Sequence, residues 1–243
     1  MDTNSERFLT AFGAIERRLR LMTGLEQRTR FYKLVDCASA ANPAVRRYSN
    51  DLKEYADLRN AIVHERTDEH VIAEPNDRAV RQIENILALL DNPPRVIPNF
   101  QKPVYTMTPE DPIAAAAFLM LAHDFSQLPI VNSDGHFVAL LTSNDITRWI
   151  GISVPQQVID LEKTVIAEIM NCNAEEGVPG AGPDYTFFSR DETVFAALDV
   201  FQECGQCGVR LEAILITQHG SPAEELLGII TIWDLPTIYD SLG

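Results

Sequence analysis

The chain has 243 residues, of which 46% are hydrophobic and 23% charged, as in a globular protein with a sizeable core. No apolar run approaches the roughly 20 residues that cross a bilayer, and the first residues lack the basic-then-apolar pattern of a secretory signal. The four cysteines are few for this length, so the sequence predicts a reduced, cytoplasmic setting without membrane contact.

The net charge of −15 belongs to the second part of the chain. Residues 96–243 hold 5 basic and 20 acidic residues, whereas residues 1–95 hold 15 of each and are neutral. Nucleic-acid backbones are bound through clustered Lys and Arg, which excludes the acidic part as a general nucleic-acid binder. Basic clusters in the first part leave RNA contact open there: Arg17, Arg18 and Arg20; Arg28, Arg30 and Lys33; Arg46 and Arg47.

The first region, up to about Asp91, is predicted to be an all-α unit of about four helices. Near its start, apolar residues recur every three or four positions, as on one face of a helix: Phe8, Phe12, Ile15, Leu19 and Met22. A longer helix is expected from Pro43, with Asn42 as its cap, to about Glu65. Shorter helices are expected at 30–40 and 77–90, and negligible strand content is expected.

The second region alternates strands and helices, and the order strand, helix, strand, strand, helix occurs twice. Two prolines before it, at 93 and 94, end the last helix of the first region. The sequence therefore predicts an α+β protein with four parts: a helical domain (1–92), a linker (93–102), and two βαββα repeats (103–160 and 161–243). Within the first repeat, the opening strand is expected at 104–107.

Each repeat has the same motif after its last strand. The first reads ALLTSNDI at 139–146 and the second GIITIWDL at 228–235, so both give a buried strand, Thr, two residues and Asp. With the upstream segments TMTPEDPIAAAAFLML, LPIVNSDGHFVALLT and SRDETVFAALDVF, this pattern resembles tandem CBS domains, the pair called a Bateman module. Ala139 stands where family members usually carry Gly. The resemblance implies a regulatory module that binds an adenosine-containing ligand.

The chemistry of Thr-x-x-Asp suits such a ligand. A carboxylate can accept two hydrogen bonds from the vicinal hydroxyls of a ribose, and a Thr hydroxyl with helix-start N–H groups can meet a phosphate. Carried over from the family, the ligand residues are Thr142 with Asp145 and Thr231 with Asp234. Arg148 is a candidate phosphate partner, and Thr106 and Ile130 complete the predicted set. The alternative is a capping box, in which Thr and Asp only close the start of a helix.

The predicted ligand is an adenine nucleotide, AMP, ADP or ATP, and no metal is predicted. Cys204 and Cys207 have C-x-x-C spacing, but no second pair completes a zinc site, so two incidental thiols are the prediction. The Gly- and Pro-rich insertion 173–183 is predicted to be a surface loop, with a lid over the ligand as the alternative.

The long helix of the first region ends in LRNAIVHE at 58–65. Arg59, Asn60 and His64 there resemble the R-x-x-x-x-H motif of HEPN domains, a helical family that includes metal-independent ribonucleases. His64 could move a proton and Arg59 could neutralise a pentavalent phosphate, with Asn60 on the same face as His64. The alternative is structural, with Arg59 paired to a helix carboxylate such as Glu16.

Two functions follow from these motifs. The first is a sensor: the CBS pair binds an adenosine-containing nucleotide and modulates a helical, HEPN-like domain that forms a homodimer. The second is a HEPN-type ribonuclease, acting on RNA at the first domain and gated by the CBS pair. Whether the chain is an enzyme stays open at this point, because only Arg59 and His64 separate the two.

Overall fold

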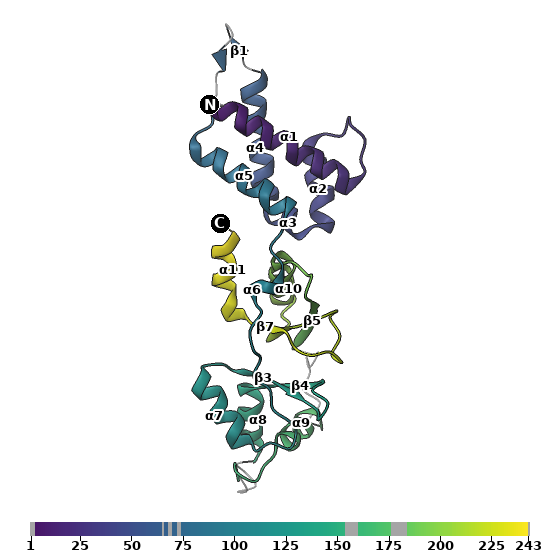
Figure 1. Cartoon of the computed structure of the whole chain (residues 1–243), viewed down its shortest axis with the longest axis vertical. Coiled ribbons are helices and arrows are strands. Elements are labelled where there is room, and N and C mark those ends of the chain that lie inside the picture. The colour runs from purple at the N-terminus through teal and green to yellow at the C-terminus, as the bar shows by residue number, and fades with distance from the viewer. Residues whose placement is uncertain are drawn as a thin grey trace. The chain divides into compact units, whose positions relative to one another are not determined.

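The computed structural model describes residues 3–64, 66–67, 70–71, 74–153, 160–175 and 184–242 (Figure 1). At residues 64, 66–67, 70–71, 172–175 and 241 it describes the backbone alone. The chain divides into two compact units. The first comprises residues 1–94 with 193–199 and Leu242, and the second comprises the rest. The mixture of helices and sheets confirms the predicted α+β class.

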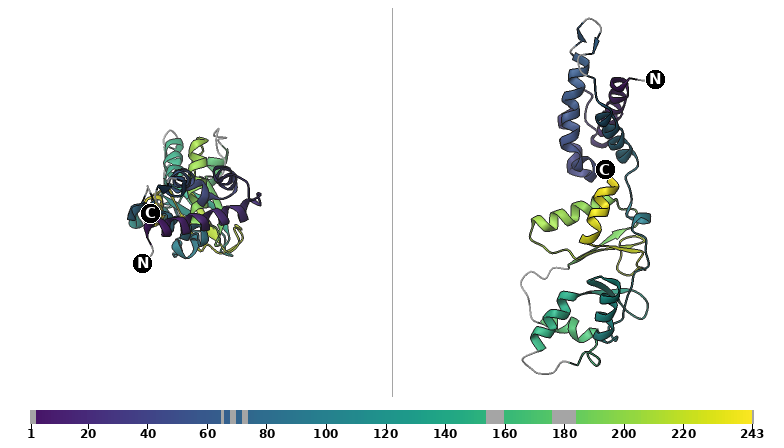
Figure 2. Two further views of the ribbon diagram at one scale, coloured as in Figure 1. Left: turned by 90° about the horizontal axis from the view of Figure 1, so that it is seen from above. Right: turned by 90° about the vertical axis from the view of Figure 1, so that its left-hand side faces the viewer.

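The first unit is built mainly from helices. They are α1 (Asn4–Thr23), α2 (Phe31–Ala41), α3 (Pro43–Arg47), α4 (Ser49–His64) and α5 (Asp77–Asp91). A hairpin that the sequence did not predict joins α4 to α5 through β1 (Arg66–Thr67) and β2 (His70–Val71). Phe8, Phe12, Ile15 and Leu19 of the apolar repeat are buried, whereas Met22 is 38% exposed. The helix α1 packs beside α5 and α2 (Figure 2).

The predicted cap at the start of α3 is confirmed, but the single long helix expected beyond it is wrong. The Asn42 side chain accepts a hydrogen bond from the Val45 N–H at 3.0 Å. At Tyr48 the backbone leaves the helical region, with φ −101° and ψ 15°, so α3 ends and α4 begins anew. Tyr48 is 7% exposed and its hydroxyl donates to the carbonyl of Leu242 at 2.9 Å, a long-range contact that local periodicity could not reveal.

The remaining elements form two copies of one pattern. The first copy contains α7 (Ile113–His123), β3 (Gln127–Val131), β4 (Phe137–Thr142) and α8 (Ser143–Ser153); the second contains β5 (Tyr185–Ser189), α10 (Val194–Gln206), β6 (Ala213–Thr217), β7 (Gly228–Ile230), the 3-10 turn η2 (Ile232–Asp234) and α11 (Leu235–Leu242). Two helices precede the copies, α6 (Val96–Asn99) and α9 (Ile166–Glu175). None of the described helices combines the length and the apolar character that a membrane span requires.

Strand pairing follows the same rule in both copies. β3 pairs antiparallel with β4, and β6 pairs antiparallel with β7. The opening strand of the second copy, β5, runs parallel to β6 over five residue pairs. Its counterpart, expected at 104–107, is reduced to a single parallel bridge between Met107 and Ile130, so most of that predicted strand is not formed.

The segment before the second copy packs on the first. The Ile166 N–H of α9 donates to the Asp111 carbonyl at 3.0 Å. Ile166 and Ile169 are fully buried in a core that also holds Leu141 and Trp149. The helices α7, α8 and α9 therefore gather on one face of the β3–β4 hairpin (Figure 1).

The segment before the first copy packs reciprocally on the second. The Val96 N–H of α6 donates to the Glu192 carbonyl at 2.8 Å, and Gln101 forms an antiparallel bridge with Gly228. A Cβ at Gly228 would overlap the carbonyl oxygen of Phe100. This close approach of two backbones explains why glycine stands at the start of β7.

Gly228→Ala tests this packing. The added methyl group must displace the Phe100 backbone, so we expect the free energy of unfolding to fall by about 1–3 kcal/mol. Urea unfolding of the whole chain measures it. Gly151→Ala, on α8 with nothing within 4 Å of the new Cβ, is the control and should stabilise slightly. Equal stability of the two variants would contradict the packing of the segment 96–101 on the second copy.

Candidate ligand-binding site

The end of β7 is fixed by the second copy's Thr-x-x-Asp motif. The Asp234 carboxylate accepts hydrogen bonds from the Thr231 N–H at 2.8 Å and the Thr231 hydroxyl at 3.0 Å, both at Oδ2. Its other oxygen, Oδ1, lies 3.6 Å from Nζ of Lys102. The cap therefore uses one carboxylate oxygen and directs the second toward a cation.

The first copy repeats the cap. Asp145 Oδ2 accepts from the Thr142 N–H at 2.8 Å and from the Thr142 hydroxyl at 2.6 Å, and the Asp145 N–H donates back to that hydroxyl at 3.1 Å. The capping interpretation thus describes hydrogen bonds that both motifs make. It does not exclude a ligand, because a carboxylate offers about four acceptor positions.

A cavity of about 740 Å³ opens beside Thr231 and Asp234. Its other walls come from Lys102 to Tyr105, from residues 123–127 at the end of α7 and the start of β3, from Pro129 and Ile229, and from Trp233 in η2. Pockets for small molecules usually measure about 300–1,000 Å³. The cavity is therefore large enough for a nucleoside and combines apolar and polar walls.

Three rings in the cavity wall lie against one another. The ring centroids of Tyr105 and His123 are 4.2 Å apart, and those of His123 and Phe125 are 6.0 Å apart with an angle of 12° between the planes. Tyr105 is 49% exposed, so its ring is accessible. Such flat aromatic surfaces bind nucleobases by stacking.

The structure divides the predicted ligand residues. Thr231 and Asp234 line the cavity, whereas the other five do not: Thr106, Ile130, Thr142, Asp145 and Arg148. Ile130 is fully buried in the core of the first copy. The predictions for these five residues stay predictions of a second site.

Sequence reasoning missed Lys102, Tyr105, His123 and Phe125. Lys102 and Tyr105 lie before and within the expected opening strand, and His123 and Phe125 lie at and just after the end of α7. All four line one cavity with Asp234. The one signal in the sequence is that Lys102 is the first of only five basic residues after position 95.

The surroundings of Asp145 differ from those of Asp234. Burial raises the pKa of the half-buried Asp184 carboxyl, and the nearby charges of Asp145 and Glu212 raise it further. Glu212 is 8% exposed, forms an ion pair with Arg210 and accepts a hydrogen bond from Gln127 Nε2 at 3.0 Å. Carboxylates therefore gather near Asp145, whereas Asp234 faces Lys102.

The HEPN-like motif lies on α4. Arg59 is half-buried and its Nη1 donates to Oδ1 of the exposed Asn60 at 3.3 Å. The carboxylate suggested as its partner, Glu16, instead binds Arg20 at 2.6 Å. His64 is the last residue of α4, and its side chain lies outside the described residues. The ribonuclease and RNA hypotheses therefore stay predictions.

The remaining predicted features concern metals and the insertion. Among the described side chains, no group of three His, Cys, Asp or Glu residues is placed to hold a metal ion. Cys204 and Cys207 are free thiols. Residues 173–175 belong to α9 rather than to the surface loop expected there, and residues 176–183 lie outside the described residues.

Comparison with known proteins identifies the class of the first copy. Residues 99–152 match the family described as CBS domain, so the chain contains a CBS domain, as the sequence motif predicted. No curated protein matches the chain.

The fold is similar to solved structures of CBS proteins. One is the CBS domain of a CBS domain containing membrane protein from Sphaerobacter thermophilus, with 19% identity over 66% of this chain and 96% of that chain, at a TM-score of 0.44. Another is the CBS domain pair of protein MJ0100 with 5′-methylthioadenosine and S-adenosyl-L-methionine, with 20% identity over 62% and 99% and a TM-score of 0.43. CBSX2 in complex with AMP has 12% identity over 59% and 95%, with a TM-score of 0.42.

Replacing Asp184 with Asn tests the acidic environment of Asp145. Because the pKa of Asp184 is raised in the folded chain, its charged form destabilises the fold above that pKa. We expect Asp184→Asn to raise the thermal midpoint at pH 7 by roughly 1–3 °C. As the pH falls through the raised pKa toward 3.8, the wild type binds a proton and the difference shrinks. Asp134→Asn, in an exposed turn, is the control. A larger rise of the thermal midpoint in this control would contradict the destabilising role of the Asp184 charge.

Proposed function

We propose that this protein is a sensor whose CBS repeats bind an adenosine-containing ligand in the cavity beside Thr231 and Asp234. The proposal rests on the residues that line this cavity. The cavity combines a capped carboxylate and an accessible ring stack, which suit the ribose and the base of a nucleoside, with one lysine beside the carboxylate. The ligand class itself comes from the resemblance to CBS domains.

Each group has a role in this proposal. The Asp234 carboxylate accepts hydrogen bonds from the two ribose hydroxyls, and its cap to Thr231 holds it in place for them. The adenine ring stacks on the accessible ring of Tyr105, which His123 supports. Lys102 lies beside Asp234, with its Nζ 3.6 Å from Oδ1.

A second site at Thr142, Asp145 and Arg148, as the family resemblance implies, has weaker support. None of these three residues lines the cavity that Asp234 shares with Lys102 and the three rings. The proposal therefore expects one ligand per chain, held by the second copy's motif.

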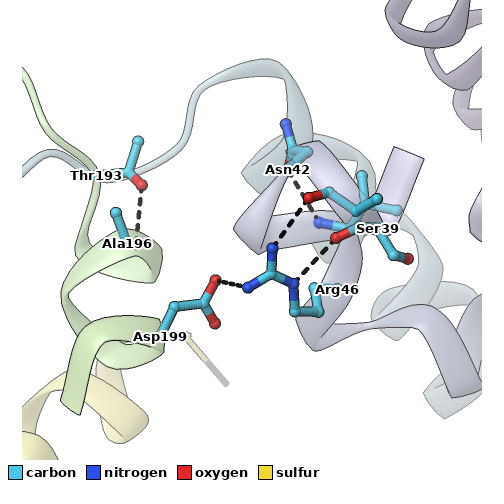
Figure 3. Close-up of polar contacts among 8 residues, drawn as sticks. Ser39, Asn42, Arg46, Thr193, Ala196 and Asp199 are labelled. Atoms are coloured by element: carbon cyan, nitrogen blue, oxygen red, sulfur yellow. Dashed lines mark hydrogen bonds and ion pairs between the residues drawn. The ribbon is translucent and has the colours of Figure 1, made fainter. Parts of the chain in front are cut away.

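The start of α10 offers a route from the CBS repeats to the helical domain. Within the first unit, the Arg46 guanidinium donates to Asp199 of α10 at 2.8 Å and to the carbonyl oxygen of Ser39 at 3.0 Å (Figure 3). The ring of Phe195, also on α10, meets Tyr48 edge-on at a centroid distance of 6.1 Å. A ligand that stiffens the second copy would act on α2 and α3 through these contacts.

Self-association through α7 completes the proposal. Phe118 and Leu121 on this helix are 71% and 81% exposed, and α7 carries no Asp, Glu, Lys or Arg. At the corresponding positions α10 has polar Asp199 and Gln202. The helices α8, α9, α10 and α11 each carry a carboxylate. In a region with a net charge of −15, a second copy of the chain can approach at α7 without bringing carboxylates together.

Asp234→Asn tests the ligand site. The amide keeps the size of the side chain but removes the charge that strengthens two hydrogen bonds, so we expect the affinity for adenosine, AMP or S-adenosylmethionine to fall at least about tenfold. Isothermal titration calorimetry on the full chain measures it. Asp145→Asn, which makes the same change in the first copy, should alter affinity less than about twofold. Loss of binding in Asp145→Asn alone would move the site to the other repeat, and no binding by any of the three compounds would refute the proposed function.

Leu121→Lys tests self-association. A charge on α7 must be desolvated in the proposed dimer, so we expect the variant to be monomeric at concentrations where the wild type is dimeric. Light scattering coupled to gel filtration gives the masses. Leu21→Lys is the matched control, because Leu21 is 80% exposed on α1. Dissociation by the control alone would place the interface on the helical domain instead.

A further inference from the structure

The cavity is poor in positive charge, and this restricts the ligand. Residues 96–243 contain five basic residues: Lys102, Arg148, Lys163, Arg190 and Arg210. Among the described residues that line the cavity, Lys102 is the only Lys or Arg. The segments of this region that the structure leaves undescribed, 154–159 and 176–183, contain neither residue type.

The other basic residues already have acidic or polar partners, or lie elsewhere. Lys163 pairs with Asp160 at 3.0 Å, Arg190 donates to Gln218 at 3.2 Å, and Arg210 pairs with Glu212. Arg148 lies on α8 and does not line the cavity. A ligand in the cavity therefore meets no second cation from this set without breaking an existing contact.

Nearby carboxylates offset the positive charge of Lys102. Its Nζ lies 3.6 Å from Oδ1 of Asp234, and Asp124 also lines the cavity. Among the described Lys, Arg, Asp and Glu side chains of the wall, one is a cation and two are anions. A terminal phosphate carries about −1.5 to −2 charges at pH 7, and each further phosphate adds to this. Burying such a chain here would place it against carboxylates with only one counter-charge.

We infer that the ligand is an adenosine derivative with little or no net negative charge: adenosine itself, a neutral 5′ derivative, or one with a cationic 5′ substituent such as a sulfonium. This inference rests on the proposed function and narrows it, since the family resemblance admits AMP, ADP and ATP as well. The cationic substituent would be attracted to Asp124, and the ribose would take the acceptor positions of Asp234.

Calorimetric titration of the full chain with adenosine, S-adenosylmethionine, AMP and ATP tests the inference. ATP is measured with and without Mg²⁺, because the metal neutralises part of its charge. We expect adenosine or S-adenosylmethionine to bind at least about tenfold more tightly than ATP in either condition. ATP binding as tightly as adenosine would overturn the inference while leaving the proposed function intact. If none of the four compounds binds, the proposed function fails and the inference fails with it.

A variant tests whether the charge of the cavity wall, rather than its shape, causes the selectivity against ATP. Asp124→Asn removes one negative charge from the wall and suits the left-handed backbone at this position, where φ is 54°. The ratio of ATP affinity to adenosine affinity should rise about threefold or more. Asp134→Asn makes the same change in an exposed turn outside the cavity and should leave the ratio unchanged. An unchanged ratio in Asp124→Asn would contradict charge as the cause of the selectivity.

Discussion

The hydrogen bonds between Asp234 and Thr231 fix the turn at which β7 ends and the last helix begins. One carboxylate oxygen takes both the N–H and the hydroxyl of Thr231, and the other lies 3.6 Å from Lys102. The candidate site depends on this division, because a carboxylate held by its own cap is already oriented when a ligand arrives. The cap and the binding role of Asp234 are therefore compatible, and preorganisation is what the cap contributes.

The two CBS-like copies share this backbone arrangement and differ in what surrounds it. The neighbours of Asp145 include Asp184, whose pKa burial raises, and Glu212, which is paired with Arg210. Near Asp234 they are a lysine and a stack of rings. Internal duplication thus yields two equivalent caps, and a cavity of about 740 Å³ lies beside the second cap. The chemistry of the walls, rather than the motif, separates the two positions.

Local features of the fold could be predicted from the sequence. The Asn42 cap, the paired Thr-x-x-Asp motifs and the order of strands and helices all follow from interactions over a few residues. The break at Tyr48 could not, because the apolar spacing continues through it and the contact of Tyr48 with Leu242 joins residues far apart in the sequence. Most of the cavity wall also could not be predicted from the sequence. Lys102 lies beside the second copy's motif because its segment pairs with that copy, as Gln101 does with Gly228, whereas His123 reaches the same cavity wall from α7 of the first copy.

The central claim, that Asp234 accepts hydrogen bonds from a ribose diol, is tested most directly by ligands that lack one hydroxyl. The affinities of adenosine, 2′-deoxyadenosine and 3′-deoxyadenosine for the full chain should be compared by calorimetry. A hydrogen bond to a carboxylate is worth about 1.5–3 kcal/mol, so each deoxy compound should bind about tenfold or more weakly than adenosine. Binding of all three within about twofold would show that the carboxylate does not hold the ribose and would contradict the account.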